Sequence, residues 1–298
     1  MGVLDVLSVT AGTGLLAGGY GFAESRAFTT RTIDANVLPA GSPSLRVLHL
    51  SDLHITPAQS RKISWVRSLA ALEPDLVVVT GDFLAHQLAV PAVVEALGNL
   101  MNLPGLFVLG SNDYFAPELK NPLAYFNKDR TIRNTGRALP THDLVDELTR
   151  GGWLDLDNAQ ASITINGVAI HARGTDDPHI KRDDYAKVAG PFAEGTFALG
   201  VTHAPYVRVL NSFALDGADL VLAGHTHGGQ VCVPFYGALV TNCDLPTNQA
   251  KGWSTFVNEG REMPIHVSAG VGTSPYTQIR IACRPEATLL TLNALTTS

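Results

Sequence analysis

Six histidine and aspartate residues of this chain stand in short motifs whose spacing suits metal binding. They are Asp52, His54, Asp82, His203, His225 and His227. In Asp52-x-His54 and in His225-x-His227 the two residues alternate, so extended backbone points both side chains the same way and both can hold one ion. A lone histidine or a lone Gly-Asp is more often structural. Four such motifs in a chain with ten histidines nevertheless favour a shared metal site.

Each of the four motifs closes an apolar, β-branched run that is typical of a buried strand. The runs cover residues 46–50, 76–79, 197–201 and 220–223. Open α/β sheets place their ligand sites just beyond the carboxyl ends of strands, so we expect the four motifs to converge in space.

The mixture of ligand types restricts the metal. Cys232, Cys243 and Cys283 are isolated from one another, which argues against a structural thiolate zinc site. Imidazole suits Zn, Fe or Mn, and carboxylate oxygen suits Mn and other hard ions. Six ligands exceed the need of one zinc ion, so we expect two divalent or Fe-type ions, about 3.5–4 Å apart. Asp82 stands alone between the other groups and is the natural bridge.

Together with a Gly-Asn-type turn near residue 110, these motifs resemble the calcineurin-like metallophosphoesterases over roughly residues 45–292. Residues 224–231 and 280–292 are similar to a bacterial, often membrane-linked branch that includes UDP-diacylglucosamine pyrophosphatase-like proteins. The resemblance implies hydrolysis of a phosphate ester or pyrophosphate by in-line attack of a hydroxide that bridges two ions. It also implies a ligand set, in which one ion is held by Asp52, His54 and His227, the other by His203 and His225, and Asp82 is shared.

One motif departs from the family pattern. The family turn reads Gly-Asn-His-Asp or Gly-Asn-His-Glu, where Asn is a ligand and His assists the leaving group, but this chain has Gly110-Ser111-Asn112-Asp113. Without a gap, Ser111 takes the ligand position; with a shift of one residue, the amide oxygen of Asn112 meets the metal. We prefer Asn112, because a neutral Ser hydroxyl is a poor metal donor. In both alignments the assisting His is missing, and proton delivery by such a group is worth roughly 10²–10⁴-fold.

The predicted elements form an α/β fold, in which helices and strands alternate at first and strands dominate after residue 150. Two facing mixed sheets with helices outside account for this order, and the resemblance implies the same four-layer α/β/β/α sandwich. Asn166-Gly167 predicts a hairpin. We interpret residues 1–44 as an apolar leader and linker with a candidate membrane-associated helix, and residues 45–298 as one metallophosphoesterase catalytic domain. The expected strands cover 46–51, 75–80, 105–110, 161–165, 168–172, 196–201, 220–223, 265–268 and 287–292, and the expected helices cover 58–72 and 91–101.

Charge and the terminal segment bear on partners. A net charge of −6 argues against extended nucleic acid as a partner and leaves a phosphate-containing small molecule or a lipid-linked substrate. No charge interrupts the stretch from Val6 to Phe22, whose length is at the lower limit for spanning a bilayer. This segment either contacts a membrane surface or packs on the domain. Arg26 and Arg31 follow it, which would leave the catalytic domain cytoplasmic.

A long connection, residues 114–141, is either a solvated excursion or a lid that recognises phosphate or lipid. Lysine and arginine side chains suit contacts to phosphate. The basic residues of this connection are Lys120, Lys128, Arg130, Arg133 and Arg137. Asn242 and Asp244 are candidate partners for the imidazole N–H groups, although loop roles fit them equally well. We interpret His171 as a structural strand residue.

Two other functions remain open. One is a degenerate relative that binds metal or phosphate with little turnover, which the Ser111-Asn112 pair suggests. The other is a hydrolase with one metal or with a substrate that is not a phosphate ester.

Overall fold

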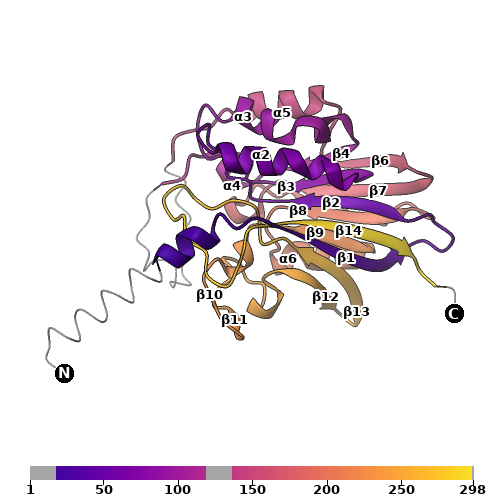
Figure 1. Ribbon diagram of the computed structural model, residues 1–298. Coiled ribbons are helices and arrows are strands. Elements are labelled where there is room, and N and C mark those ends of the chain that lie inside the picture. The colour runs from indigo at the N-terminus through magenta and orange to yellow at the C-terminus, as the bar shows by residue number, and fades with distance from the viewer. Residues whose placement is uncertain (1–17, 119–135, 297–298) are drawn as a thin grey trace, which may run out of the picture.

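The structure is a computed structural model that describes residues 18–118 and 136–296. Figure 1 shows two β-sheets stacked face to face, with helices on the outer face of each. This arrangement is the four-layer α/β/β/α sandwich that the sequence predicts. It follows from the sequence because the central strands are apolar on both faces, and each face therefore needs a cover.

The first sheet runs in the order β1-β14-β2-β3-β4-β5. Strands β2, β3, β4 and β5 are parallel, whereas β14 is antiparallel to β2 and parallel to β1. Its strands are β1 (Thr29–Leu38), β2 (Leu45–Leu50), β3 (Leu76–Thr80), β4 (Gly105–Val108), β5 (Leu154–Asp155) and β14 (Glu286–Ala294).

The second sheet runs in the order β12-β13-β9-β8-β7-β6. Strands β7, β8, β9 and β13 are parallel, and two antiparallel hairpins form its edges. The Asn166-Gly167 turn joins β6 to β7 as predicted. The strands are β6 (Gln160–Ile165), β7 (Val168–Thr175), β8 (Phe197–Thr202), β9 (Leu220–Ala223), β12 (Gly252–Asn258) and β13 (Arg261–Val267).

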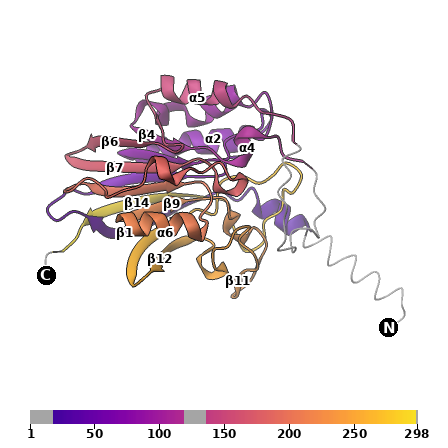
Figure 2. The ribbon, with the colours of Figure 1, turned by 180° about the vertical axis from the view of Figure 1, so that it is seen from behind.

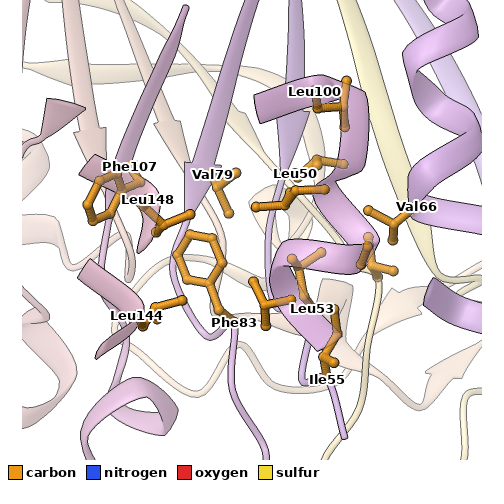
Figure 3. Close-up of a cluster of buried hydrophobic side chains, with 14 of the residues drawn as sticks. Leu50, Leu53, Ile55, Val66, Val79, Phe83, Leu100, Phe107, Leu144 and Leu148 are labelled. Carbon is orange, nitrogen blue, oxygen red and sulfur yellow. The ribbon is translucent and has the colours of Figure 1, made fainter. Parts of the chain in front are cut away.

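Helices α2 (Ser60–Ser68), α3 (Val90–Leu97) and α5 (Thr141–Arg150) cover the outer face of the first sheet. Figure 3 shows the core beneath them, where Val66, Leu144 and Leu148 from the helices meet Leu50 and Phe107 from the strands. On the other side of the molecule, α6 (Val207–Asp216) packs on the second sheet, as Figure 2 shows. A third apolar cluster fills the space between the two sheets.

Two further elements matter for the site. The short helix α4 (Ser111–Tyr114) follows β4 directly, and a small hairpin of β10 (Cys232–Val233) and β11 (Gly237–Ala238) follows the His225-x-His227 motif. Within the described residues, no helix is long and apolar enough to span a bilayer.

The sequence analysis missed several elements, among them β1, β5, β12, α5 and α6 and the short α4, β10 and β11. It placed residues 29–38 in the leader and linker, but they form β1, which pairs with β14 along most of its length. Of the long connection, residues 119–135 with Lys120, Lys128, Arg130 and Arg133 lie outside the described part of the chain.

Candidate metal centre

The four motifs converge at one end of the sandwich, between the carboxyl ends of strands from both sheets. Asp52 and His54 follow β2, and Asp82 follows β3 in the same sheet. His203 follows β8, and the His225-x-His227 motif follows β9. Because the strands within each set are parallel, their ends lie at the same edge, which explains why residues 175 positions apart can meet.

Four of the six side chains form a compact group: Asp52, His54, Asp82 and His227. Each offers a ligand atom within 4.8 Å of the others. His54 Nε2 lies 3.4 Å from Asp82 Oδ2 and 3.3 Å from His227 Nε2. His227 Nε2 lies 3.4 Å from Asp52 Oδ1. Asp52 Oδ1 is buried without a hydrogen-bond partner among the described residues, which fits a cation at this position.

The other two histidines lie on the second side of Asp82. His203 Nε2 is 3.7 Å from Asp82 Oδ1, and His225 Nδ1 is 3.3 Å from His203 Nε2. Asp82 therefore faces His54 with one carboxylate oxygen and His203 with the other. The Asp82 carboxylate therefore lies between the two groups of histidines.

Backbone carbonyls contact a ring nitrogen of three of the histidines. A carbonyl can only accept, so His203 Nδ1 donates to Thr80 O at 2.7 Å and His225 Nε2 donates to Asn242 O at 3.3 Å. The third, His227 Nδ1, lies 3.2 Å from Gly272 O and 3.3 Å from Arg280 Nη2, and it donates to the carbonyl when Nδ1 carries the ring proton. In each of these tautomers the opposite nitrogen of the ring directs a lone pair into the site. Two lone pairs that face each other across 3.3 Å, on His203 and His225, are compatible only with a cation or proton between them.

Burial disfavours the charged form of the side chains in the site and so shifts their pKa values. It raises the pKa of both Asp52 and Asp82, and it lowers the pKa of His54 and His225 well below its ordinary range. Burial, with the Arg280 guanidinium nearby, lowers the pKa of His227 to about 3. Neutral imidazoles beside desolvated carboxylates are the state that metal ligation needs.

His203 is the exception. Burial lowers its pKa, but Asp82, Asp177 and Asp52 outweigh this effect and raise the pKa to about 9. Its imidazole therefore holds a proton until a competing cation displaces it.

The site is built on strained backbone. Five of the six side chains stand on left-handed residues, with φ between 42° and 69°: Asp52, His54, Asp82, His225 and His227. Such conformations persist only where the surroundings over-determine them, and they cluster at functional sites. Two glycines make room for these turns. A Cβ on Gly224 would lie 1.8 Å from Ser51 Oγ, and a Cβ on Gly110 would lie 2.3 Å from Asp82 Oδ1.

The Gly110-Ser111-Asn112-Asp113 turn wraps around Asp82. Asn112 donates its backbone N–H to Asp82 Oδ1 at 2.8 Å and its Nδ2 to Oδ2 at 2.7 Å. Ser111 Oγ lies 3.5 Å from Asn112 Nδ2. Buried Asp113 accepts the backbone N–H groups of Asp82 and Gly110 with Oδ2, and that of Leu84 with Oδ1. Asp113 thus ties the turn to the loop that carries the bridging aspartate.

The sequence analysis did not single out three residues beside the site. Arg280 is buried and donates to the carbonyls of Ala269, Gly270 and Gly272, the last of which also receives His227 Nδ1. Buried Lys62 donates to Leu53 O and to His54 O. Arg280 and Lys62 donate mainly to backbone carbonyls, which every residue has. No spacing pattern in the sequence therefore predicts their positions.

The third such residue is His179, in the turn Pro178–Ile180. Its ring centroid is 4.3 Å from that of His225, and its Nδ1 is 3.1 Å from the Tyr206 hydroxyl. The signal available in the sequence was the neighbouring Asp176-Asp177-Pro178 run, which indicates a turn at this position.

The other sequence predictions have mixed outcomes. Asn242 contributes to the surroundings of His225, through its backbone carbonyl. Asp244 instead accepts the N–H of Val207 at the start of α6, which is a loop role. His171 lies on β7, bonded to Gln160 and to the N–H of Ala193, and so has the structural position predicted for it.

Comparison with known proteins places these features in a family. The calcineurin-like phosphoesterase family model matches residues 45–229. The metallophosphoesterase YkuE of Bacillus subtilis is 24% identical over 314 residues, covering 98% of this chain and 94% of the relative. The bovine transmembrane protein with metallophosphoesterase domain is 26% identical over 289 residues, covering 91% of this chain and 58% of the relative.

A third relative is the UDP-2,3-diacylglucosamine pyrophosphatase LpxG of Chlamydia trachomatis, which is 26% identical over 286 residues and covers 83% of each chain. The family match spans more than half of the chain and contains all six histidine and aspartate residues of the site. The chain therefore belongs to the calcineurin-like phosphoesterase family of metal-dependent hydrolases that act on phosphoric esters.

Proposed function

We propose that the protein hydrolyses a phosphate ester or pyrophosphate bond with two metal ions held at this centre. The observation that carries the proposal is the set of ligand atoms directed into the site. His203 Nε2 and His225 Nδ1 converge on one point, where a proton or a cation lies between them, and Asp52 Oδ1 has no hydrogen-bond partner among the described residues. Two cations would replace that proton and supply the interaction that Asp52 Oδ1 lacks.

One ion would be held by Asp52, His54 and His227, and the other by His203 and His225, with Asp82 between them. The distances support this division, because Asp82 Oδ2 approaches His54 and Asp82 Oδ1 approaches His203. When bound, the ions would supply a hydroxide for in-line attack at phosphorus and would neutralise charge on the phosphoryl oxygens. The mixed imidazole and carboxylate set suits Mn, Zn or Fe.

A cavity of about 330 Å³ is lined in part by Thr56, which follows His54 by two residues in the sequence, and we infer that it holds the rest of the substrate. Thr56, His86, Arg137 and Tyr276 are among its lining residues. Arg137 suits a second phosphate group, and Tyr276 suits a ring or an acyl chain. These features favour a pyrophosphate or diester with an organic group on each side, and the relative LpxG, named as a pyrophosphatase of a diacylated sugar nucleotide, supports a lipid-linked member of that class.

Removal of ligands tests the centre. We expect Asp82→Asn and His227→Ala each to lower metal content and to slow hydrolysis of bis-p-nitrophenyl phosphate by about a hundredfold or more, since even outer-sphere changes cost 10–100-fold. His171→Ala is the matched control, because it removes a buried, hydrogen-bonded imidazole from β7 without touching the site. Equal losses in His171→Ala would mean that general destabilisation explains the result.

The same assay separates the alternatives. Two ions per chain without turnover of any phosphate ester would support the degenerate relative, and one ion with cleavage of another bond type would support the third function. Metal content by mass spectrometry and a panel of monoesters, diesters and sugar-nucleotide lipids distinguish these outcomes.

The identity of the seventh ligand has its own test. We propose that Asn112 contributes its amide oxygen, with Ser111 as the competing ligand; the Asn112 amide contacts Asp82, and Ser111 Oγ lies 3.5 Å from Asn112 Nδ2. We expect Asn112→Ala to weaken binding of one ion at least about tenfold, and Ser111→Ala to leave it unchanged. The reverse order of effects in a titration with Mn²⁺ would assign the position to Ser111.

A further inference from the structure

The segment that follows His227 exposes an unusual amount of apolar surface. No charged residue stands between Gly228 and Cys243. At the tip of the β10–β11 hairpin the side chain of Phe235 is completely exposed and that of Tyr236 is 75% exposed. Val231, Val233 and Leu239 on the same hairpin are exposed as well. Exposed patches of this kind mark sites of contact with another molecule or a membrane.

The hairpin lies beside the first described helical residues, 18–24. Val231 pairs with Ile281, and the neighbouring Arg280 donates its backbone N–H to Gly21 O at 3.0 Å. The strip around residue 280 thus joins the hairpin to the helix, and Figures 1 and 2 both show the two at one end of the molecule. The helix exposes Tyr20 and Phe22. We call the exposed side chains of the hairpin and helix the hairpin surface: Tyr20, Phe22, Val231, Val233, Phe235, Tyr236 and Leu239.

Basic groups accompany this surface. The Arg26 guanidinium stacks over the Phe22 ring at 3.5 Å from its centroid. A hydrogen bond to Glu24 raises the pKa of the Tyr20 hydroxyl, and exposed Arg284 is close enough to oppose this effect. Glu24, the acid among helical residues 18–24, is itself buried and accepts the N–H groups of Ala282 and Cys283. The exposed charges beside the aromatic residues of the helix are therefore positive.

We propose that the hairpin surface docks on an anionic phospholipid bilayer. Aromatic side chains suit the boundary between headgroups and acyl chains, and arginines suit the lipid phosphates. The composition of the preceding sequence favours a bilayer over a protein partner, because no residue from Val6 to Phe22 is charged. His227, whose side chain is 14% exposed, starts the segment that leads into the hairpin, so docking brings the metal centre to the lipid surface.

Vesicle binding by the full chain tests the proposal. We expect stronger co-sedimentation with vesicles that mix phosphatidylglycerol into phosphatidylcholine than with phosphatidylcholine alone. The double variant Phe235→Asn/Tyr236→Ser should bind about tenfold more weakly; Asn suits position 235 because φ there is 67°. Leu215→Ser/Val257→Ser, which changes two exposed apolar residues elsewhere, should bind like the wild type. Equal binding by all three proteins, or an equal loss in both double variants, would overturn the proposal.

A second readout reports the hairpin itself, independently of binding through other segments. A tryptophan introduced by Phe235→Trp should be quenched by brominated lipids beyond the level of the wild type, whereas one introduced by Leu215→Trp should not. Equal quenching at both positions, or none at 235, would refute the docking mode. So would a loss of self-association in the Phe235→Asn/Tyr236→Ser variant with unchanged vesicle binding, because the hairpin would then contact a second copy.

This inference stands apart from the proposed hydrolysis. The hairpin variants should cleave the soluble bis-p-nitrophenyl phosphate at the wild-type rate, because neither residue belongs to the metal centre. Vesicle binding without hydrolysis would support the docking surface and contradict the proposed hydrolase activity. Hydrolysis without vesicle binding would support the hydrolase activity and contradict the docking surface.

Discussion

At the scale of single residues, Asp113 shows how the centre depends on a side chain that is not among its expected ligands. Its two oxygens accept three backbone N–H groups, among them that of Asp82. In Asp113→Asn an amide NH₂ would face at least one of these donors. We expect a loss of about 1–3 kcal/mol in stability and of about 10–100-fold in metal affinity, measured by urea unfolding and Mn²⁺ titration. The exposed Asp143→Asn in α5 is the control, and an Asp113 variant with unchanged affinity would contradict this role.

The residue scale also shows where prediction from sequence stops. Asp52, His54, Asp82 and the three later histidines could be found because ligand types recur at strand ends, and the structure brings all six together. Arg280 and Lys62 could not be found, because they donate to carbonyl oxygens, and every residue carries a carbonyl. The choice between Ser111 and Asn112 stays a prediction, since the Asn112 side chain contacts both Asp82 and Ser111.

At the scale of elements, two buried histidines join the sheets. His49 on β2 and His266 on β13 meet at 2.8 Å between their Nδ1 atoms, and burial lowers the pKa of His266 from 6.5 to about 3. Below pH 6.5 the His266 imidazole binds a proton in the unfolded chain but not in the folded one. The free energy of unfolding is therefore retained above this pH and falls as the pH decreases. The loss is about 1.4 kcal/mol per pH unit for one such group.

We therefore expect His266→Gln, which can keep the bond to His49, to lose less stability than the wild type between pH 7 and pH 5.5. Urea unfolding in the presence of a chelator measures the difference without a contribution from bound metal. His142→Gln, on the exposed side of α5, should follow the wild type. Parallel slopes for the wild type and the His266 variant would show that this pair is not responsible for acid sensitivity.

The elements predicted correctly share one property. Strands β2, β3, β8 and β9 are almost entirely buried, so short and mostly apolar runs reveal them. Strand β1, with the sequence Thr-Thr-Arg-Thr-Ile-Asp-Ala-Asn-Val-Leu, is half exposed and mostly polar because it forms the edge of its sheet. Its pairing with β14 depends on contacts some 250 residues away in the chain, and no local pattern encodes them.

At the scale of the whole molecule, the sandwich brings the metal centre and the hairpin surface to one end, while the carboxyl-terminal end of the described chain lies at the other, as Figure 1 shows. The four-layer architecture could be predicted because two apolar sheets need helices outside them. The hairpin surface could not, because an apolar run without charge reads equally well as a buried strand. Only its exposure in the structure distinguishes the two.

Strand β14 imposes an order on biosynthesis. It lies between β1 and β2, which would otherwise be neighbours in the sheet. While the polypeptide is translated, both of these early strands wait with open edges until Glu286–Ala294 emerges from the ribosome. The loop after β2 carries Asp52 and His54, so the sheet that supports these two residues is complete only once β14 has been added. Until then the open edges of β1 and β2 expose the unfinished sheet to aggregation.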